Sequence, residues 1–233
     1  MSNQMKIKIT LVAALSAVVL SACGGGGSDA VVAPAAPAAA TTFPLDTAYT
    51  QVSTTGISLS GTAVDGIDTW TMALSVTPAA DETFEGATAK KSVQSVTFKK
   101  NGATVVSSGG ESFFTIAPFR VKGLKLNDGT YGVQTVAGGA LSNAAKVGDS
   151  GPFGLTTVYS NSSKSSVLFT QEATWTLEAD TATTAYGCNN ITAKNTAGVV
   201  ISTTSGCYKV DTTGTVTGLK FTLAVAGKTL VFR

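Results

Sequence analysis

Apolar and polar residues alternate along much of this chain, and this period of two constrains the fold more than any other feature. A clear example is WTMALSV at residues 70–76, and the alternation recurs at residues 95–99, 174–178 and 219–225. Successive side chains of a β-strand point to opposite faces of a sheet, so the pattern predicts strands with one buried and one hydrated face. We find no long window with apolar residues at helical spacing.

Turn signals lie between these stretches at the spacing of hairpins. Asp65-Gly66, Asn101-Gly102 and Asp128-Gly129 each separate two strand-like stretches, and Gly227-Lys228 joins the last two. Asn-Gly and Asp-Gly pairs supply the positive φ that tight hairpin turns need. The sequence therefore predicts an all-β fold of about ten to thirteen mostly antiparallel strands. We expect a hairpin-rich sandwich or a rolled meander, with a closed β-barrel as the alternative.

We expect only a short helical turn, at the start of the folded part. In Phe43–Val52, Pro44 suits the first position of a helix and Asp46 falls in its first turn. From Thr42 onwards no second linker interrupts the chain, and the remaining length suffices for one domain with a substantial core. The sequence thus predicts a single β domain over residues 42–233.

The N-terminus has the features of an export signal. Lys6 and Lys8 precede the apolar run ITLVAALSAVVL at residues 9–20. As a helix this run would rise about 18 Å, which is too little for a bilayer core of about 30 Å. We interpret residues 1–22 as a signal peptide rather than as a membrane-spanning helix.

Leu20-Ser21-Ala22-Cys23 ends this segment and resembles the lipobox of bacterial lipoproteins. The resemblance implies cleavage before Cys23, a diacylglycerol thioether on its sulfur and acylation of the new amino group. Two or more acyl chains make such an attachment stable. Gly24, rather than Asp, follows the cysteine, which by analogy with enteric sorting implies transport to the outer membrane. Residues 23–41 are expected to be the lipidated cysteine and a flexible Gly-, Pro- and Ala-rich linker.

The charge balance bears on the partners. Loss of Lys6 and Lys8 with the signal peptide leaves 14 of the 16 Lys and Arg residues against 14 Asp and Glu. Nucleic-acid binding needs a basic footprint, and this chain has none. The expected partners are the membrane, through the N-terminal acyl chains, and an envelope or surface protein or glycan. The protein would be lipid-anchored at the outer membrane and face the periplasm or the cell surface.

Cys188 and Cys207 are the two cysteines left in the mature chain. Export places them in an oxidising compartment, where such a pair usually forms a disulfide. A turn-like NTAG at residues 195–198 lies midway between them. A hairpin with strands near residues 191–194 and 199–203 would therefore bring them opposite each other. Closing a loop of this length stabilises a fold by about 3 kcal/mol in the chain-entropy model.

The segment KVGDSGPFG, residues 146–154, resembles the signature around the nucleophile of trypsin-like serine proteases. A Ser-His-Asp mechanism needs imidazole to accept and return the serine proton, and the chain has no histidine. Asp149 cannot replace it, because adjacent residues of an extended strand point to opposite faces. We interpret the segment as a surface turn in which Asp149 or Ser150 bonds the local backbone and Pro152 fixes the entry to the next strand.

Other chemistries also lack their residues. The S-x-x-K motif is absent, and NSSKSS at residues 161–166 has the composition of a polar hairpin tip. Zinc-ligand spacing, calcium loops and phosphate loops are absent too. Five carboxylates could supply a glycosidase-like pair but are expected to be solubilising: Glu111, Glu172, Glu178, Asp180 and Asp211. We therefore expect no catalytic residues, no metal site and no cofactor. The predicted function is a non-enzymatic binding or structural lipoprotein, with a hydrolase of envelope polymer as the alternative.

Two further segments resemble a group of uncharacterised proteobacterial lipoproteins. The first is TFPL at residues 42–45 with Ala48-Tyr49, and the second is AKVGDSG at residues 145–151 with Tyr159-Ser160. The resemblance implies an envelope lipoprotein and carries no activity with it.

Overall fold

A computed structural model of the chain describes residues 41–225 and 228–233. The predicted signal peptide, Cys23 and all but the last residue of the predicted linker lie outside the described residues. Within the described ranges, no helix has both the length and the apolar character that crossing a bilayer requires.

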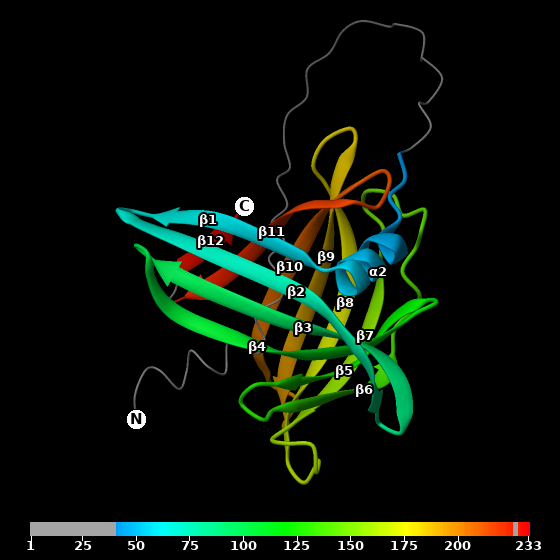
Figure 1. Ribbon diagram of the computed structural model, residues 1–233. Coiled ribbons are helices and arrows are strands. Elements are labelled where there is room, and N and C mark those ends of the chain that lie inside the picture. The colour runs from blue at the N-terminus through cyan, green and yellow to red at the C-terminus, as the bar shows by residue number, and fades with distance from the viewer. Residues whose placement is uncertain (1–40, 226–227) are drawn as a thin grey trace, which may run out of the picture.

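The described residues form twelve strands in one antiparallel sheet, in which each strand pairs with the next along the chain (Figure 1). This confirms the predicted all-β architecture, and of the forms that the sequence left open it is the rolled meander. The strands are β1 (Ile57–Asp65), β2 (Asp68–Phe84), β3 (Ala87–Lys100), β4 (Ala103–Ile116), β5 (Phe119–Leu126), β6 (Tyr131–Ala137), β7 (Ser150–Tyr159), β8 (Val167–Ala179), β9 (Thr184–Asn195), β10 (Val200–Asp211), β11 (Val216–Val225) and β12 (Lys228–Phe232).

The sheet rolls up until its first and last strands meet, which nearly closes it into a barrel. The backbone N–H of Thr62 donates to the carbonyl of Arg233 at 3.0 Å, and the N–H of Arg233 donates to the carbonyl of Thr62 at 3.3 Å. Gly61 permits this approach, because a Cβ there would lie 3.1 Å from side-chain atoms of Leu219 and Phe232. The two edge strands therefore meet at this residue pair, which covers part of the exposed edges that an open sheet would present.

Alternate residues of the long strands face the inside of the rolled sheet. Met72 of β2 lies opposite Phe98 of β3, and both are buried with Phe221 of β11 and Phe232 of β12. The ring centroids of Phe98 and Phe232 are 5.4 Å apart. The alternation read from the sequence is thus confirmed as one face in the core and one face outside.

The predicted hairpin turns are also confirmed where the structure describes them. Gly66, Gly102 and Gly129 each follow the Asp or Asn of their turn and have φ values of 61°, 82° and 91°. Residues with a Cβ rarely adopt this region, so glycine fits these positions best. The fourth predicted turn contains Gly227, which is outside the described residues.

The β2–β3 hairpin is longer than its alternating part and folds over the outside of the sheet. A register shift between Ala79 and Glu82 changes which face the following residues occupy. Phe84 is thereby buried on the outer face, where its ring stacks on Phe113 of β4 with centroids 4.3 Å apart. Tyr131 of β6 completes this outer cluster.

The predicted helical turn is an eleven-residue helix, α2 (Leu45–Thr55). Pro44 precedes it as the N-cap residue rather than occupying its first position. The sequence offered little helix propensity, because Thr and Val lose side-chain freedom in a helix. Packing provides the stability instead, since residues 45, 48, 49 and 52 have the i, i+3, i+4, i+7 spacing of one helix face and are all buried.

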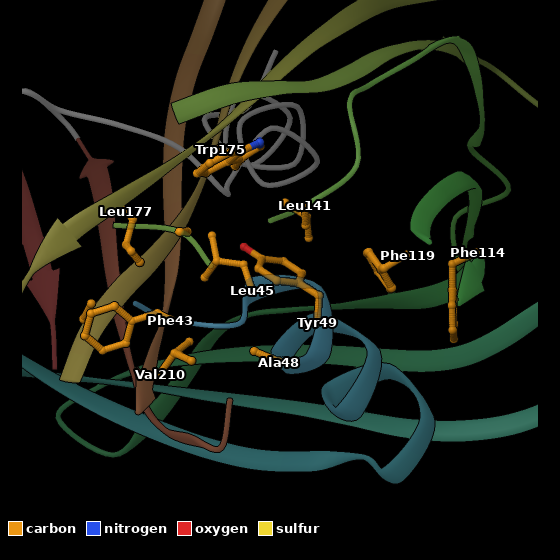
Figure 2. Packing of buried hydrophobic residues seen from close by; sticks show 12 residues of the cluster. Phe43, Leu45, Ala48, Tyr49, Phe114, Phe119, Leu141, Trp175, Leu177 and Val210 are labelled. Atoms are coloured by element: carbon orange, nitrogen blue, oxygen red, sulfur yellow. The ribbon is translucent and has the colours of Figure 1, made fainter. Parts of the chain in front are cut away.

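The buried face of α2 packs inside the rolled sheet (Figure 2). The ring of Tyr49 lies 5.7 Å from that of Phe119 in β5 and 5.6 Å from that of Tyr208 in β10. Gly187 of β9 makes room for the helix, because a Cβ there would lie 2.9 Å from Leu45 Cδ2. Segments distant in the sequence thus meet around one helix.

Candidate binding cavity inside the rolled sheet

A cavity of about 210 Å³ lies inside the rolled sheet next to α2. A second cavity of about 200 Å³ adjoins it. The two share part of their lining, namely Gln94, Val96, Ser112, Leu124, Gln171 and Ile191. The strands that the alternation predicted therefore enclose space that side chains do not completely fill.

Carboxamide and hydroxyl side chains lie on the wall of this cavity. Gln134 of β6 lies opposite Thr156 of β7, and Thr156 lies opposite Gln171 of β8, so three polar side chains form a row across three strands. Gln94 of β3 and Asn189 of β9 add two more carboxamides. These side chains can both donate and accept hydrogen bonds.

Two of these carboxamides differ in their hydrogen bonding. Gln134 Nε2 donates to the carbonyl of Phe153 at 3.0 Å. Gly154 makes this position possible, because a Cβ there would lie 2.1 Å from the same nitrogen. The carboxamide oxygen of Asn189 is buried and has no hydrogen-bond partner in the part of the chain that the structure describes.

Apolar and aromatic side chains complete the wall and include Tyr49, Leu74, Phe119, Tyr208 and Phe221. Burial raises the pKa of Tyr208 to about 12, and burial together with the neighbouring Tyr208 raises the pKa of Tyr49. Both phenols are therefore neutral over the physiological range. The Tyr49 hydroxyl donates to the carbonyl of Gly187 over 3.4 Å, which is long for such a bond.

The two charged residues among the described lining direct their charges away from the interior. The Lys220 ammonium pairs with Glu178 and lies 5.1 Å from the Tyr186 ring centroid on the outer face. The Glu111 carboxylate pairs with Lys91 at 3.0 Å, also outside. The described wall can thus offer hydrogen bonds and apolar contact, but no buried ion pair, general base or nucleophile–base pair.

The other three carboxylates considered for a glycosidase mechanism are each bonded to a lysine or to backbone N–H groups. Glu172 pairs with Lys194 at 2.8 Å, and Asp180 pairs with Lys209 at 2.7 Å. The Asp211 carboxylate accepts bonds from the backbone N–H groups of Thr213 and Thr215 at 2.8 and 2.9 Å. Hydrogen bonds lower the pKa of Asp180 and of Asp211. A general acid needs the opposite shift.

Residues 146–149 form the surface turn that the sequence predicted, whereas residues 150–154 already belong to strand β7. Asp149 Oδ2 accepts a bond from the Lys146 N–H at 2.8 Å, and Ser150 is exposed. The following strand β7 begins at Ser150, so Pro152 lies inside the strand rather than at its entry. Glycine suits position 151, because a Cβ there would lie only 2.7 Å from Trp175 Nε1.

The segments at residues 42–45 and 145–151, which the sequence analysis compared with other lipoproteins, meet at one residue pair. Phe43 and Ala145 form a β-bridge, with N–H to carbonyl distances of 2.8 and 3.1 Å in the two directions. Leu45 N–H also donates to the carbonyl of Ser142 at 2.9 Å. These bonds join the residues at the start of α2 to the loop that precedes β7.

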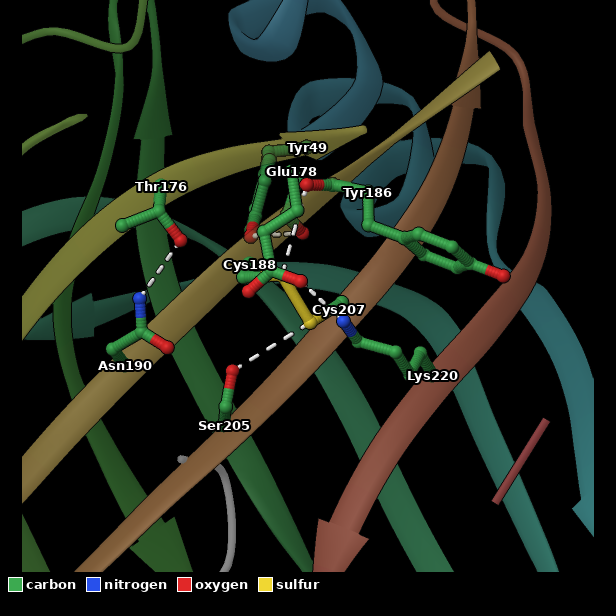
Figure 3. The surroundings of a disulfide bond; sticks show 10 residues. Tyr49, Thr176, Glu178, Tyr186, Cys188, Asn190, Ser205, Cys207 and Lys220 are labelled. Atoms are coloured by element: carbon green, nitrogen blue, oxygen red, sulfur yellow. Dashed lines mark hydrogen bonds and ion pairs between the residues drawn. A yellow bond between two sulfur atoms is a disulfide. The ribbon is translucent and has the colours of Figure 1, made fainter. Parts of the chain in front are cut away.

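The predicted disulfide between Cys188 and Cys207 is present and joins β9 to β10 on the outer face (Figure 3). The Cα atoms are 3.9 Å apart, and the hairpin turn lies at Asn195 as expected. Glu178 lies beside both sulfurs, a grouping that could suggest a metal site. Metal binding would need thiolates, and the disulfide has consumed both thiols.

Sequence reasoning missed the interior carboxamides, although a signal was present. Gln94 precedes Val96 and Phe98 at the same spacing of two, so it occupies a position where the pattern calls for an apolar residue. Gln171 likewise has the same parity as Trp175 and Leu177 in β8. A polar residue on the buried face of a strand is the feature that marks a candidate ligand contact.

No protein-family model, curated protein or solved structure matches this chain.

Proposed function

We propose that this chain is a lipid-anchored protein of the outer membrane that binds an uncharged molecule inside its rolled sheet and catalyses no reaction. The observation that carries the proposal is the cavity wall, where carboxamides lie among apolar side chains and, among the lining residues that the structure describes, no charged group turns inward. Burying a polar side chain costs free energy unless it gains a hydrogen bond. A ligand that donates to the buried Asn189 Oδ1, which has no partner among the described residues, would supply that bond.

The ligand class follows from the wall. Binding sites for small molecules combine an apolar lining with a few placed polar groups. The row Gln134, Thr156 and Gln171 would orient a donor or acceptor, while Phe119, Tyr208 and Phe221 would pack against an apolar body. A charged ligand is disfavoured, because its charge would be desolvated with no counter-ion. We therefore expect an uncharged molecule with an apolar body and at least one hydrogen-bonding group.

The anchor rests on Leu20-Ser21-Ala22-Cys23, which support the lipoprotein proposal by their resemblance to a lipobox. We expect a Cys23→Ala protein to leave the membrane fraction of cells, while a Ser28→Ala protein stays in it. Fractionation and immunoblotting measure this. A Cys23→Ala protein that remains with the membranes would contradict the lipid anchor.

The binding proposal is tested with N-phenyl-1-naphthylamine, an uncharged fluorophore in which one N–H donor joins a naphthyl group to a phenyl ring. Ala173 of β8 lines the cavity, whereas Thr174 beside it is exposed on the opposite face. We expect the dye to bind the parent protein, and Ala173→Phe to weaken binding by about ten-fold, equivalent to 1.4 kcal/mol. Thr174→Phe, which adds the same ring outside, should bind like the parent. Failure of the dye to bind, or equal binding by both variants, would contradict the proposal.

A further inference from the structure

The wall of the rolled sheet has a gap between β5 and β6. Three residue pairs join these strands, the last of them Gly123 and Val133, and this is the shortest ladder between neighbouring strands in the described residues. Beyond that pair, residues 119–122 and 134–137 have no partner on the facing strand among the described pairings. Each strand remains paired with its other neighbour, β4 or β7. We call this unpaired region the β5–β6 gap.

The gap has a local cause in both strands. In β5, the register with β4 shifts by one residue between Gly123 and Val121, so Lys122 is an extra residue. In β6, the register with β7 shifts between Gln134 and Val136, so Thr135 is an extra residue. Such bulges bend the strand that carries them and end its pairing. Two bulges at the same level therefore direct the two strands apart.

The β5–β6 gap borders the cavity. Phe119 and Val121 on one side and Gln134 on the other all line the cavity, as does Phe153 on β7 just beyond. A molecule passing between β5 and β6 would thus reach the carboxamide row directly.

Two sets of contacts close the gap. On the inside, the ring centroids of Phe119 and Phe153 are 6.5 Å apart, and Tyr49 lies 5.7 Å from each. Toward the outside, the Arg120 guanidinium donates to the carbonyl of Gly138, which ties β5 to the segment that follows β6. These contacts are between side chains or from a side chain to the backbone, so they can part without breaking a strand ladder.

We propose that the β5–β6 gap is the entrance to the cavity and that Arg120 and the Phe119–Phe153 contact hold it closed. The inference rests on the proposed function, because it supplies the route by which the uncharged ligand would reach the carboxamides. Parting these contacts moves side chains only, whereas opening any other place in the described wall would also break backbone hydrogen bonds between strands. Entry therefore requires rotation of rings and release of one guanidinium, with the sheet left intact.

The test uses a thiol placed inside the cavity and needs no ligand. In the full chain with Cys23→Ser, Ser112→Cys puts one free thiol on the wall, where Ser112 lines both cavities. The probe is N-phenylmaleimide, an uncharged and flat reagent, and mass spectrometry follows its addition. We expect Arg120→Met and Phe153→Ala to raise the labelling rate roughly ten-fold, as loss of one charge-assisted bond or one ring contact from the closed state would do.

Matched variants separate an opened entrance from a loosened fold. Lys122→Met removes a positive charge from the same strand but no contact across the gap, and should label like the parent. Phe169→Ala removes a buried ring from the cluster of Val158 and Ala193 on β7–β9, away from the gap. A rise in Phe169→Ala without a rise in Phe153→Ala or Arg120→Met would place the entrance elsewhere and overturn the proposal. A thiol that stays unreactive in every variant would overturn it too.

Dye kinetics distinguish this proposal from the proposed function. With N-phenyl-1-naphthylamine, Arg120→Met should raise the association and dissociation rates together and leave the affinity almost unchanged. Dye binding with unaltered rates would overturn the entrance and leave the binding function standing. Labelling that responds to the variants, in a protein that binds no dye, would support the entrance and contradict the binding function.

Discussion

At the scale of single residues, the main feature of the described chain is that its charged groups lie on the outside of the rolled sheet, whereas the cavity wall presents uncharged groups. Outside, Lys91 bonds Glu82 at 2.6 Å and Glu111 at 3.0 Å, and Lys125 bonds Glu82 at 2.6 Å. On the described wall of the cavity, the polar side chains are carboxamides such as Gln171 and hydroxyls such as Thr156. Exposed ion pairs add little to stability individually, but a shared network acts as a unit.

Glu82 makes this network sensitive to acid. Hydrogen bonds from Lys125 and Lys91 lower the pKa of Glu82 from 4.5 to about 2. A lowered folded-state pKa means that Glu82 contributes stability above its unfolded value, and this contribution is lost as the pH falls from about 4.5 to about 2. We expect Glu82→Gln to reduce the loss of stability over this window, measured by urea unfolding at several pH values.

Glu172→Gln is the control for that experiment, because Glu172 has a single lysine partner and is 57% exposed. The dependence of its free energy of unfolding on pH should follow that of the parent more closely than the Glu82→Gln profile does. Part of the acid sensitivity will remain in Glu82→Gln, since hydrogen bonds also lower the pKa of Glu85, Asp180 and Asp211. A Glu82→Gln profile that coincides with that of the parent would contradict a role for this network.

At the scale of elements, α2 shows where packing overrides local preference. Tyr49 contacts rings from β5, β7 and β10, with centroids 5.6 to 5.7 Å away. Its hydroxyl makes one long hydrogen bond of 3.4 Å. The ring, rather than the hydroxyl, should therefore carry most of the free energy of docking the helix.

We expect Tyr49→Ala to lower the free energy of unfolding by about 3 to 5 kcal/mol, the usual cost of deleting a large buried ring. Tyr49→Phe keeps the ring contacts and should cost less than about 1.5 kcal/mol, the net value of one hydrogen bond. Chemical denaturation compares the two. Equal losses in both variants would show that the hydroxyl, not the ring, fixes the helix.

The elements also show how far the sequence could lead. Alternation and Asp-Gly or Asn-Gly turns gave the strands and hairpins, because one-sided burial and positive φ leave direct traces in a sequence. The helix at residues 45–55 was underestimated, since its stability comes from rings on distant strands. The bulges after Ala79 and around Lys122 and Thr135 could not be read either. A bulge is defined by two paired strands, so the β5–β6 gap appears only when the pairing is known.

The same limit applies to the candidate site. The hairpin that joins Cys188 to Cys207 could be predicted, because a turn midway between the two cysteines places them opposite each other on the paired strands. The cavity could not, since Gln94, Gln134 and Gln171 lie far apart in the chain and come together only when the sheet rolls up. Whether an interior is filled or hollow depends on how closely facing side chains approach, and a single strand does not contain that information.

At the scale of the whole molecule, closure sets the fold apart from an open meander. Every ladder joins strands that follow one another in the sequence, whereas β1 meets β12 from opposite ends of the domain. Closing a long loop costs entropy that local hairpins do not pay. The contacts that join the two ends should thus form late in folding and open first.

Deletion of Arg233 tests this closure. The residue contributes a backbone N–H and a carbonyl, both bonded to Thr62. We expect the deletion to cost about 1 to 3 kcal/mol, the net value of two hydrogen bonds, and to raise amide hydrogen exchange in β1 and β12 ahead of the central strands. Arg233→Ala keeps both backbone groups and should exchange like the parent. If Arg233→Ala raised hydrogen exchange in β1 and β12 as much as the deletion, the closing interaction would belong to the guanidinium instead. If neither variant raised it, Arg233 would have no role in closure. Loss of protection throughout β4–β9 would show that the sheet opens as one unit, because closure would then be inseparable from the core.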